Sequence, residues 1–307
     1  HAVALLWQFT GDKALLARQW PRVLAATRYM EQLRQSERSA ANQQPGREAL
    51  WGTMPASISH EGYSDKPMHS YWDDFWALRG YKDAVLLAQA ADKADDAKQI
   101  KAWRDEFQAE LVQSIAAAMK QHGKTFIPGA AELGDFDATS TTVALSPAQA
   151  VLPAGLLQAT FERYWQEATA RRDGKREWKD YTPYELRSVG ALLRLGQPER
   201  AWAMLDFFFK DQRPEGWNQW AEVVMRNPRE VHFLGDMPHA WVSSDFMRSA
   251  LDLFAYERER DHSLVLGAGL KAEWLQSASG VAVKGLLTAT GTLDYALTPQ
   301  HEGWQLE

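Results

Sequence analysis

The sequence of 307 residues contains no cysteine, no long apolar run and no cluster of basic residues. Without cysteine the chain forms no disulfide bond, has no thiolate nucleophile and binds no zinc through sulfur. A membrane-spanning helix needs about 18 or more consecutive apolar residues, which no stretch of the sequence provides. The net charge is −6, and without a basic surface for phosphate groups nucleic acid is not an expected partner.

Sequence motifs for bound cofactors are missing as well. No HExxH, P-loop or GxGxxG pattern occurs, so the sequence supports no zinc, nucleotide or dinucleotide cofactor, and we expect none. Glu132, Asp135 and Asp137 follow one another at i, i+3 and i+5, a spacing that suggests calcium. The run lacks the dense alternating oxygen ligands of an EF-hand loop, so calcium is only weakly indicated.

Tryptophan, in contrast, is abundant with 14 residues, and two of them, with three other aromatic residues, accompany acidic residues in residues 59–76. Aromatic rings offer flat apolar faces to a sugar ring, while carboxylates accept hydrogen bonds from its hydroxyls. The segment therefore indicates a carbohydrate pocket at the start of a helix. The same residues also fit a structural role, with the rings in the core and the acids capping a helix that begins near Asp73. The candidate site residues here are His60, Glu61, Tyr63, His69, Trp72, Asp73, Asp74 and Trp76.

A second loop of similar composition covers residues 212–238, late in the chain. Its centre runs from Trp217 to Glu222, and its end leads into His239 and Trp241. The candidates in and after this loop are Trp217, Trp220, Glu222, Asp236, His239 and Trp241. Between the two segments, Asp137 is a further candidate for holding sugar hydroxyls.

Apolar residues recur at helical spacing through most of the first 260 residues. Gly196 and Pro198 link two helices so tightly that they are expected to be antiparallel neighbours. After Asp261, short alternating runs at residues 264–266, 281–283, 286–290 and 293–297 predict strands of a small antiparallel β module. We therefore expect an α-helical domain over residues 1–260 and a β-strand module over residues 261–307. Helices are expected at residues 12–38, 71–92, 95–121, 138–142, 154–170, 183–195, 198–210 and 240–258. Pro21 lies inside the first of these and predicts a kink or a break there.

The lengths of the connecting loops alternate. Short links occur near residues 11, 93 and 197, and long loops lie between them. In a ring of helical hairpins, all long loops fall on one side and surround a pocket, which is the layout of an α/α toroid. The long loops are expected at residues 39–70, 122–137, 171–182 and 212–238.

Two groups of short motifs support this interpretation. The first group is Gly52-Thr53-Met54-Pro55, Glu61-Gly62-Tyr63 and Tyr71-Trp72-Asp73-Asp74-Phe75-Trp76, and the second is Trp220-Ala221-Glu222 and Pro238-His239-Ala240-Trp241. Together they resemble the six-hairpin, (α/α)6 glycoside hydrolases, the group of glucoamylases, trehalases and processing α-glucosidases. The first group resembles the segment with the general acid, and the second resembles the loop with the general base. The resemblance covers most of residues 10–300 and extends to a β module like that of bacterial rhamnosidases.

The chain departs from this group in its number of helices. Only about eight are expected before the β module, whereas six hairpins make twelve. We expect an all-α (α/α)6 toroid that lacks its N-terminal helices. These helices were removed, or they lie on another chain that completes the ring. The alternative is an incomplete ring. The chain begins His-Ala-Val without an initiator methionine or a signal peptide, consistent with a processed or truncated piece. Sugar-degrading enzymes of this kind are often exported, so a periplasmic or secreted location is expected.

The resemblance implies inverting hydrolysis of a glycosidic bond. One protonated carboxyl gives its proton to the leaving oxygen, and a carboxylate roughly 6.5–9.5 Å away activates water. Asp73 is the first choice for the acid because it follows Trp72, and burial against aromatic rings would raise its pKa as required. Asp74 and Glu61 are rivals for this role, and Glu222 is the expected base.

Two other classes of function stay open. A polysaccharide lyase or sugar epimerase would share the toroid, but a lyase needs a Tyr or His base and a cation to neutralise a uronate, and the loops are rich in acids instead. A non-catalytic carbohydrate-binding protein would need the aromatic surfaces without a positioned pair of acids. The sugar and the linkage are not specified by these motifs.

Overall fold

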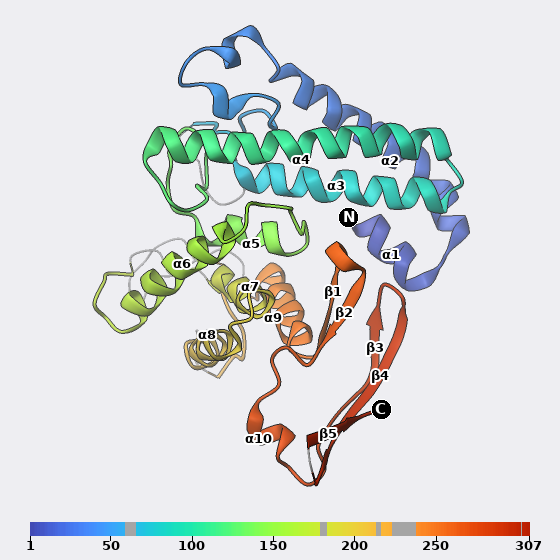
Figure 1. Cartoon of the computed structure of the whole chain (residues 1–307), viewed down its shortest axis with the longest axis vertical. Coiled ribbons are helices and arrows are strands. Elements are labelled where there is room, and N and C mark those ends of the chain that lie inside the picture. The colour runs from blue at the N-terminus through green and yellow to red at the C-terminus, as the bar shows by residue number, and fades with distance from the viewer. Residues whose placement is uncertain (59–65, 179–182, 213–215, 223–237, 302) are drawn as a thin grey trace. The chain divides into compact units, whose positions relative to one another are not determined.

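The computed structural model of the chain describes residues 1–58, 66–178, 183–212, 216–222, 238–301 and 303–307 (Figure 1). It is mostly helical and has a small antiparallel sheet at its C-terminal end, as the sequence predicts. The residues form two compact units, residues 1–166 and 167–307, and helix α6 (Leu156–Arg172) runs across the boundary. Among the described residues we find no helix with the length and apolarity that a bilayer crossing requires.

The first unit is built around an antiparallel helical hairpin. Helices α3 (Tyr71–Ala90) and α4 (Ala94–His122) lie along each other (Figure 1). On α4, Phe107, Leu111 and Ile115 recur at four-residue spacing and are almost completely buried, which places one face of the helix in the core. The other helices of this unit are α1 (Ala2–Thr10), α2 (Lys13–Ser36) and α5 (Ala138–Leu145).

Helix α2 runs from Lys13 to Ser36 although Pro21 lies inside it. Of the two predicted outcomes at this proline, a kink or a break, the break is therefore wrong. A proline removes one backbone donor from a helix, and here buried side chains on both sides of it, Trp20 and Thr27, hold the two halves in one helix.

The start of α3 lies where two chain segments meet. Ser70 is the N-cap residue, and the N–H of Tyr71 donates to the carbonyl of Gly129 at 3.0 Å. Isolated β-bridges join Ser57 to Met68 and Ser70 to Ala130. The helix thus begins two residues before Asp73, so that Asp73 and Asp74 lie in its first turn, where the helix dipole favours acids.

The second unit contains a short-linked pair of helices, as predicted. Helices α7 (Arg187–Arg194) and α8 (Pro198–Lys210) contact each other, and Gly196 between them has a φ of 72°. The N–H groups of Gly196 and Gln197 donate to the carbonyl groups of Leu193 and Leu192 at the end of α7. Glycine favours the left-handed conformation that this helix end requires. A 3-10 turn, Pro183–Leu186, precedes α7, and α9 (Ala240–Asp252) follows α8.

The predicted helix over residues 240–258 is wrong in its last third. Helix α9 ends at Asp252, and Ala255–Arg258 forms strand β1, which pairs antiparallel with β2 (Ser263–Leu266). The chain extends here because its carbonyl groups find partners across the hairpin: Phe254 accepts from Gly267 at 2.8 Å, and Leu253 accepts from Gly269 at 2.9 Å.

The C-terminal sheet agrees with the predicted strands. Strands β3 (Val281–Thr288), β4 (Gly291–Gln300) and β5 (Gly303–Leu306) form an antiparallel sheet in that order. Two predicted runs, residues 281–283 and 286–290, belong mainly to one strand, β3, with an irregularity between Val283 and Leu286. A short helix, α10 (Ala272–Leu275), precedes this sheet. The toroidal arrangement of the helices stays a prediction.

Candidate functional site

The two neighbouring acids at the start of α3 have different surroundings. Asp74 is 1% exposed, and its Oδ1 accepts a hydrogen bond from the Met54 N–H at 2.8 Å. Burial raises the pKa of Asp74 to about 8; the Met54 N–H opposes this shift, and the charge of Asp73 adds to it. Asp73 is half-buried and accepts a hydrogen bond from the Ser57 hydroxyl. Asp74 is therefore protonated at neutral pH but shielded, whereas Asp73 has access to solvent.

The two tryptophans of this segment lie in or against the core of the first unit. Trp72 is 6% exposed and belongs to the core, and Trp76 packs against it edge to face with ring centroids 5.9 Å apart. The centroid of the His1 ring lies 5.9 Å from that of Trp76. These contacts give both rings the structural role considered above, and their role in sugar binding stays a prediction.

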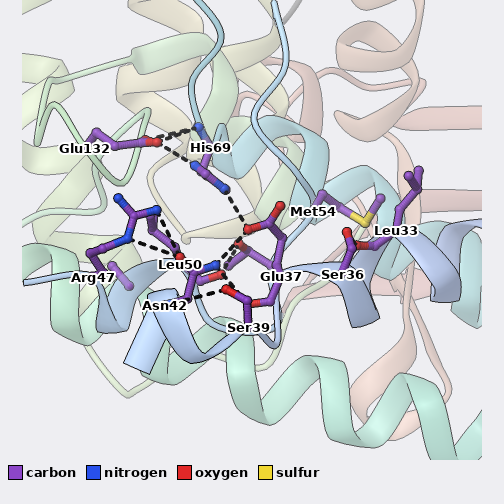
Figure 2. A network of polar contacts seen from close by, with 12 residues as sticks. Leu33, Ser36, Glu37, Ser39, Asn42, Arg47, Leu50, Met54, His69 and Glu132 are labelled. Atoms are coloured by element: carbon purple, nitrogen blue, oxygen red, sulfur yellow. Dashed lines mark hydrogen bonds and ion pairs between the residues drawn. The ribbon is translucent and has the colours of Figure 1, made fainter. Parts of the chain in front are cut away.

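His69 is the centre of a buried polar network (Figure 2). Its Nδ1 lies 2.5 Å from Glu132 Oε1, its Nε2 lies 3.3 Å from Glu37 Oε2, and its backbone N–H donates to Glu132 at 3.0 Å. Asn42 donates to the same Glu37 oxygen at 2.7 Å, and Arg47 donates to Asn42 Oδ1 at 3.0 Å. The network joins the end of α2 to the segments before and after the hairpin, so His69 fixes the backbone one residue before the N-cap of α3.

The charges in this network stabilise one another. Burial opposes the charged forms, but the hydrogen bond and charge of Glu132 raise the pKa of His69 above its usual value. The pKa of Glu132 is lowered, because the hydrogen bond and charge of His69 outweigh its own burial. Each of the two groups thus stabilises the charged form of the other.

We expect His69→Gln to destabilise the chain in a pH-dependent way. Because the folded pKa of His69 is raised, the stabilisation by its charge is complete below about pH 6.5 and is lost as the pH rises through the folded value. At pH 6 the variant should lose about 2 kcal/mol of unfolding free energy, and less at pH 9. Urea unfolding at both pH values measures this difference. The exposed His301→Gln serves as control; a loss that does not depend on pH would contradict the charged pair.

The three acids of the weakly indicated calcium run have separate partners. Glu132 binds His69, Asp135 accepts from the Ala130 N–H at 2.9 Å, and Asp137 caps α5 by accepting from the Thr139 and Ser140 N–H groups. Within the described ranges we find no group of His, Cys, Asp or Glu residues that could hold a metal ion. The carboxylate of Asp137 is occupied by helix capping, so its predicted contact to sugar stays a prediction.

In the second unit, the two ends of the late loop are held together. The N–H of His239 donates to the Trp220 carbonyl at 3.2 Å. Tyr184 lies between the side chains: its hydroxyl is 2.7 Å from His239 Nε2 and donates to Glu222 Oε1 at 3.3 Å. A phenol has one proton, so when Tyr184 donates it to Glu222, His239 Nε2 is the donor to Tyr184. Glu222 is half-buried, whereas Tyr184 is 5% exposed.

Trp241 and Arg187 complete this cluster. The Trp241 ring lies edge to face with Tyr184 at 5.7 Å, and Trp241 is 40% exposed. Arg187 lies 5.0 Å from the centre of the Tyr184 ring and donates to Asp245 at 2.9 Å. The cluster thus combines a carboxylate, a phenol and an imidazole beside an accessible indole ring.

A hollow of about 700 Å³ opens in the same unit. Its walls include Trp220 and the residues on both sides of His239, Pro238 and Ala240. Phe209, Trp220 and Phe246 contact one another with ring centroids 5.3–5.9 Å apart. The polar wall residues are Gln212, Asn218, Gln219 and Ser243. An aromatic wall with a few polar groups is typical of a small-molecule site.

The structure therefore brings the predicted residues together in two sets. Asp73, Asp74, Trp72, Trp76 and His69 gather at the start of α3 in the first unit, and Trp220, Glu222, His239 and Trp241 gather in the second. Trp217, 61% exposed, precedes Asn218 of the hollow. His60, Glu61, Tyr63 and Asp236 lie outside the described residues. The pairing of an acid from one set with the base from the other stays a prediction.

Tyr184, Arg187 and Glu37 are site residues that the sequence does not single out. Tyr184 stands in a helix-start pattern, Thr182-Pro183-Tyr184-Glu185, and its partner His239 lies 55 positions further on. No local pattern connects the two. We compared the chain with models of protein families and with curated proteins, and neither comparison found a match.

Proposed function

We propose that this protein hydrolyses a glycosidic bond in an oligosaccharide or polysaccharide. The observation that carries the proposal is the position of Glu222. Its carboxylate accepts a hydrogen bond from Tyr184. Trp220, two residues before Glu222 in the sequence, lines the aromatic hollow. A carboxylate beside an aromatic wall can accept a proton from water while a sugar ring stacks nearby.

In this proposal Glu222 is the general base and Asp73 the general acid. Asp73 is preferred over Asp74 because an acid must touch the leaving oxygen, and Asp74 is 1% exposed. Asp74 is protonated near neutral pH and places an uncharged carboxyl directly beside Asp73 in the first turn of α3. An inverting mechanism with these two roles would fit an (α/α)6 arrangement of the helices, which we propose with it.

The products of the reaction test the proposal. We expect the purified chain to release a reducing sugar from at least one member of a panel of gluco-, rhamno-, arabino- and fucosides. The first-formed anomer, read by NMR, should have the opposite configuration to the substrate, because water attacks from the face opposite the leaving group. A first-formed anomer of retained configuration would contradict the inverting mechanism, and release from no substrate would contradict the function.

One observation favours a polysaccharide lyase as the second candidate. A lyase needs a base that removes a proton beside a uronate, and the Tyr184 hydroxyl lies 2.7 Å from His239 Nε2 with Arg187 over its ring. Arg187 is, however, paired with Asp245, and the carboxylate of Glu222 would repel an anionic sugar. Lyase products have a new double bond that absorbs ultraviolet light, so absorbance after incubation with polyuronates distinguishes the two functions.

A further inference from the structure

A second hollow, of about 330 Å³, lies in the first unit beside the middle of α4. It is bounded by the two 3-10 turns that precede α3, Ala40–Gln43 and Glu48–Leu50, and by one face of α4. We call it the α4 hollow. Its rim is formed by Gln43, Glu48, Trp51 and Gln113, and Asn42 and Ser114 lie at its buried base. Asn42 also belongs to the His69 network described above, and none of the residues proposed for catalysis lines the hollow.

The base of the α4 hollow is fixed by internal hydrogen bonds. The Ser114 hydroxyl donates to the Ala49 carbonyl. The Tyr71 hydroxyl lies 2.9 Å from the Ser114 hydroxyl. Asn42 donates to Glu37 and accepts from Arg47, as Figure 2 shows. Because these groups hydrogen-bond within the protein, they fix the shape of the hollow, and the groups that can bind a ligand are those of the rim.

The rim offers polar groups that make no hydrogen bond to the residues that the structure describes. Gln43 and Gln113 are exposed and Trp51 is half-buried, and none of these three side chains makes a hydrogen bond within the described part of the chain. One oxygen of Glu48 accepts from the Gly46 N–H at 2.8 Å, which leaves its other oxygen available. The rim therefore combines two amides, an indole and a carboxylate, which together donate and accept hydrogen bonds around an aromatic face.

The charge around the hollow indicates which class of ligand fits. Glu110, which also lines it, binds Arg34 and Arg38 at 2.5 Å each, and both cations also pair with Glu106. Glu48 is the charged residue of the rim, and no lysine or arginine is among the lining residues. Arg47 and Arg38 contact the lining residues Asn42 and Glu110 and are engaged by those contacts, so a neutral ligand matches the hollow better than an anion such as a phosphate. Amides and a carboxylate around an indole ring match a ligand with many hydroxyl groups and an apolar ring face.

We propose that the α4 hollow binds a neutral sugar unit, stacked on Trp51 and held through its hydroxyls by Gln43, Gln113 and Glu48. Neither Asp73 nor Glu222 lines this site, which would hold a carbohydrate chain on the protein without cleaving it. The choice of carbohydrate agrees with the proposed function, but the geometry of the α4 hollow supports it independently.

The test uses the full chain with Glu222→Gln, so that added sugar is not consumed. The indole N–H signal of Trp51, assigned by its loss in Trp51→Phe, is followed by NMR during titration with maltotetraose, cellotetraose, xylotetraose and arabinotetraose. We expect a saturable shift with at least one of these sugars and none with inorganic phosphate or free lysine. Gln113→Ala should raise the Kd about tenfold, since a hydrogen bond is lost, whereas the exposed Gln121→Ala on the same helix should not change it.

Two results would overturn the inference: no shift of the Trp51 signal with any of the four sugars, or a shift that Gln113→Ala leaves unchanged. A stronger response to phosphate or lysine than to sugars would also overturn it. Hydrolysis by the unmodified chain is measured separately. Sugar binding at Trp51 without hydrolysis of any glycoside would contradict only the proposed function, and hydrolysis without binding at Trp51 would contradict only this inference.

Discussion

Replacing Glu222 by glutamine, or Asp73 by asparagine, is expected to lower kcat for glycoside hydrolysis by about a thousandfold, with sugar binding retained. Each change removes a proton donor or acceptor whose contribution to such reactions is about a hundredfold to ten-thousandfold. Neither change alters the volume of the side chain, so stacking on the aromatic hollow should persist. Steady-state kinetics on the best substrate of the glycoside panel, together with binding of the released sugar, measure both effects.

Asp74→Asn is the matched control for Asp73→Asn. Asp74 is protonated near neutral pH, because burial raises its pKa to about 8, and an asparagine resembles a protonated aspartate in shape and charge. The amide oxygen of the asparagine could still accept from the Met54 N–H, which donates to Asp74 at 2.8 Å. We expect this variant to fold and to keep most of its activity.

The opposite result for the two variants, an inactive Asp74→Asn and an active Asp73→Asn, would exchange the roles of the two acids. If Asp74→Asn abolished hydrolysis in a folded protein while Asp73→Asn kept it, Asp74 would be the acid and the access argument for Asp73 would be wrong. Full activity of Glu222→Gln would remove Glu222 from the mechanism. The base would then have to be sought among the other acids of the late loop.

Replacing Arg34 by methionine is expected to lower the free energy of unfolding of the first unit by about 3–5 kcal/mol. Arg34 is completely buried and binds Glu31 at 2.7 Å, Glu106 at 2.8 Å and Glu110 at 2.5 Å, which joins α2 to α4. Without the guanidinium, Glu31 would remain as a buried carboxylate with no cation beside it. That loss is large compared with the total stability of a typical domain, about 5–15 kcal/mol.

Urea unfolding followed by circular dichroism measures the effect of Arg34→Met. The control is Lys101→Met, which breaks the ion pair of Lys101 with Asp105 on the exposed surface of α4. An exposed pair contributes less than about 1 kcal/mol, so the control should change little. Restoration of part of the lost stability by Glu31→Met in the Arg34→Met background would support the charge argument. Equal effects of Arg34→Met and Lys101→Met would refute it.

The fold could be predicted from the sequence where its signals are local. Gly196 and Pro198 end one helix and start the next within three residues, and the structure has α7 and α8 there. The four-residue spacing of Phe107, Leu111 and Ile115 likewise predicts the buried face of α4. A break at Pro21 and a helix as far as residue 258 were wrong. Buried side chains on both sides of Pro21 accompany a continuous α2, and pairing with β2 places residues 255–258 in a strand.

The site could be predicted only in part, for the same physical reason. Both segments are rich in aromatic and acidic residues, and this composition identifies them. Their partners are distant in sequence, however: His69 binds Glu132 across 63 positions, and Tyr184 binds His239 across 55. Periodicity and capping rules describe neighbours along the chain, so they indicate candidate residues but not which of these hydrogen bonds form.

The buried carboxyl of Asp74 makes the folding of the first unit a proton-consuming reaction near neutral pH. In the unfolded chain this group is ionised above about pH 4, whereas in the folded chain it keeps its proton up to about pH 8. Between these values, folding takes up to one proton from the buffer through this residue. At pH 7 the protonated Asp74 makes the folded protein about one charge less negative than the formal −6 of its composition.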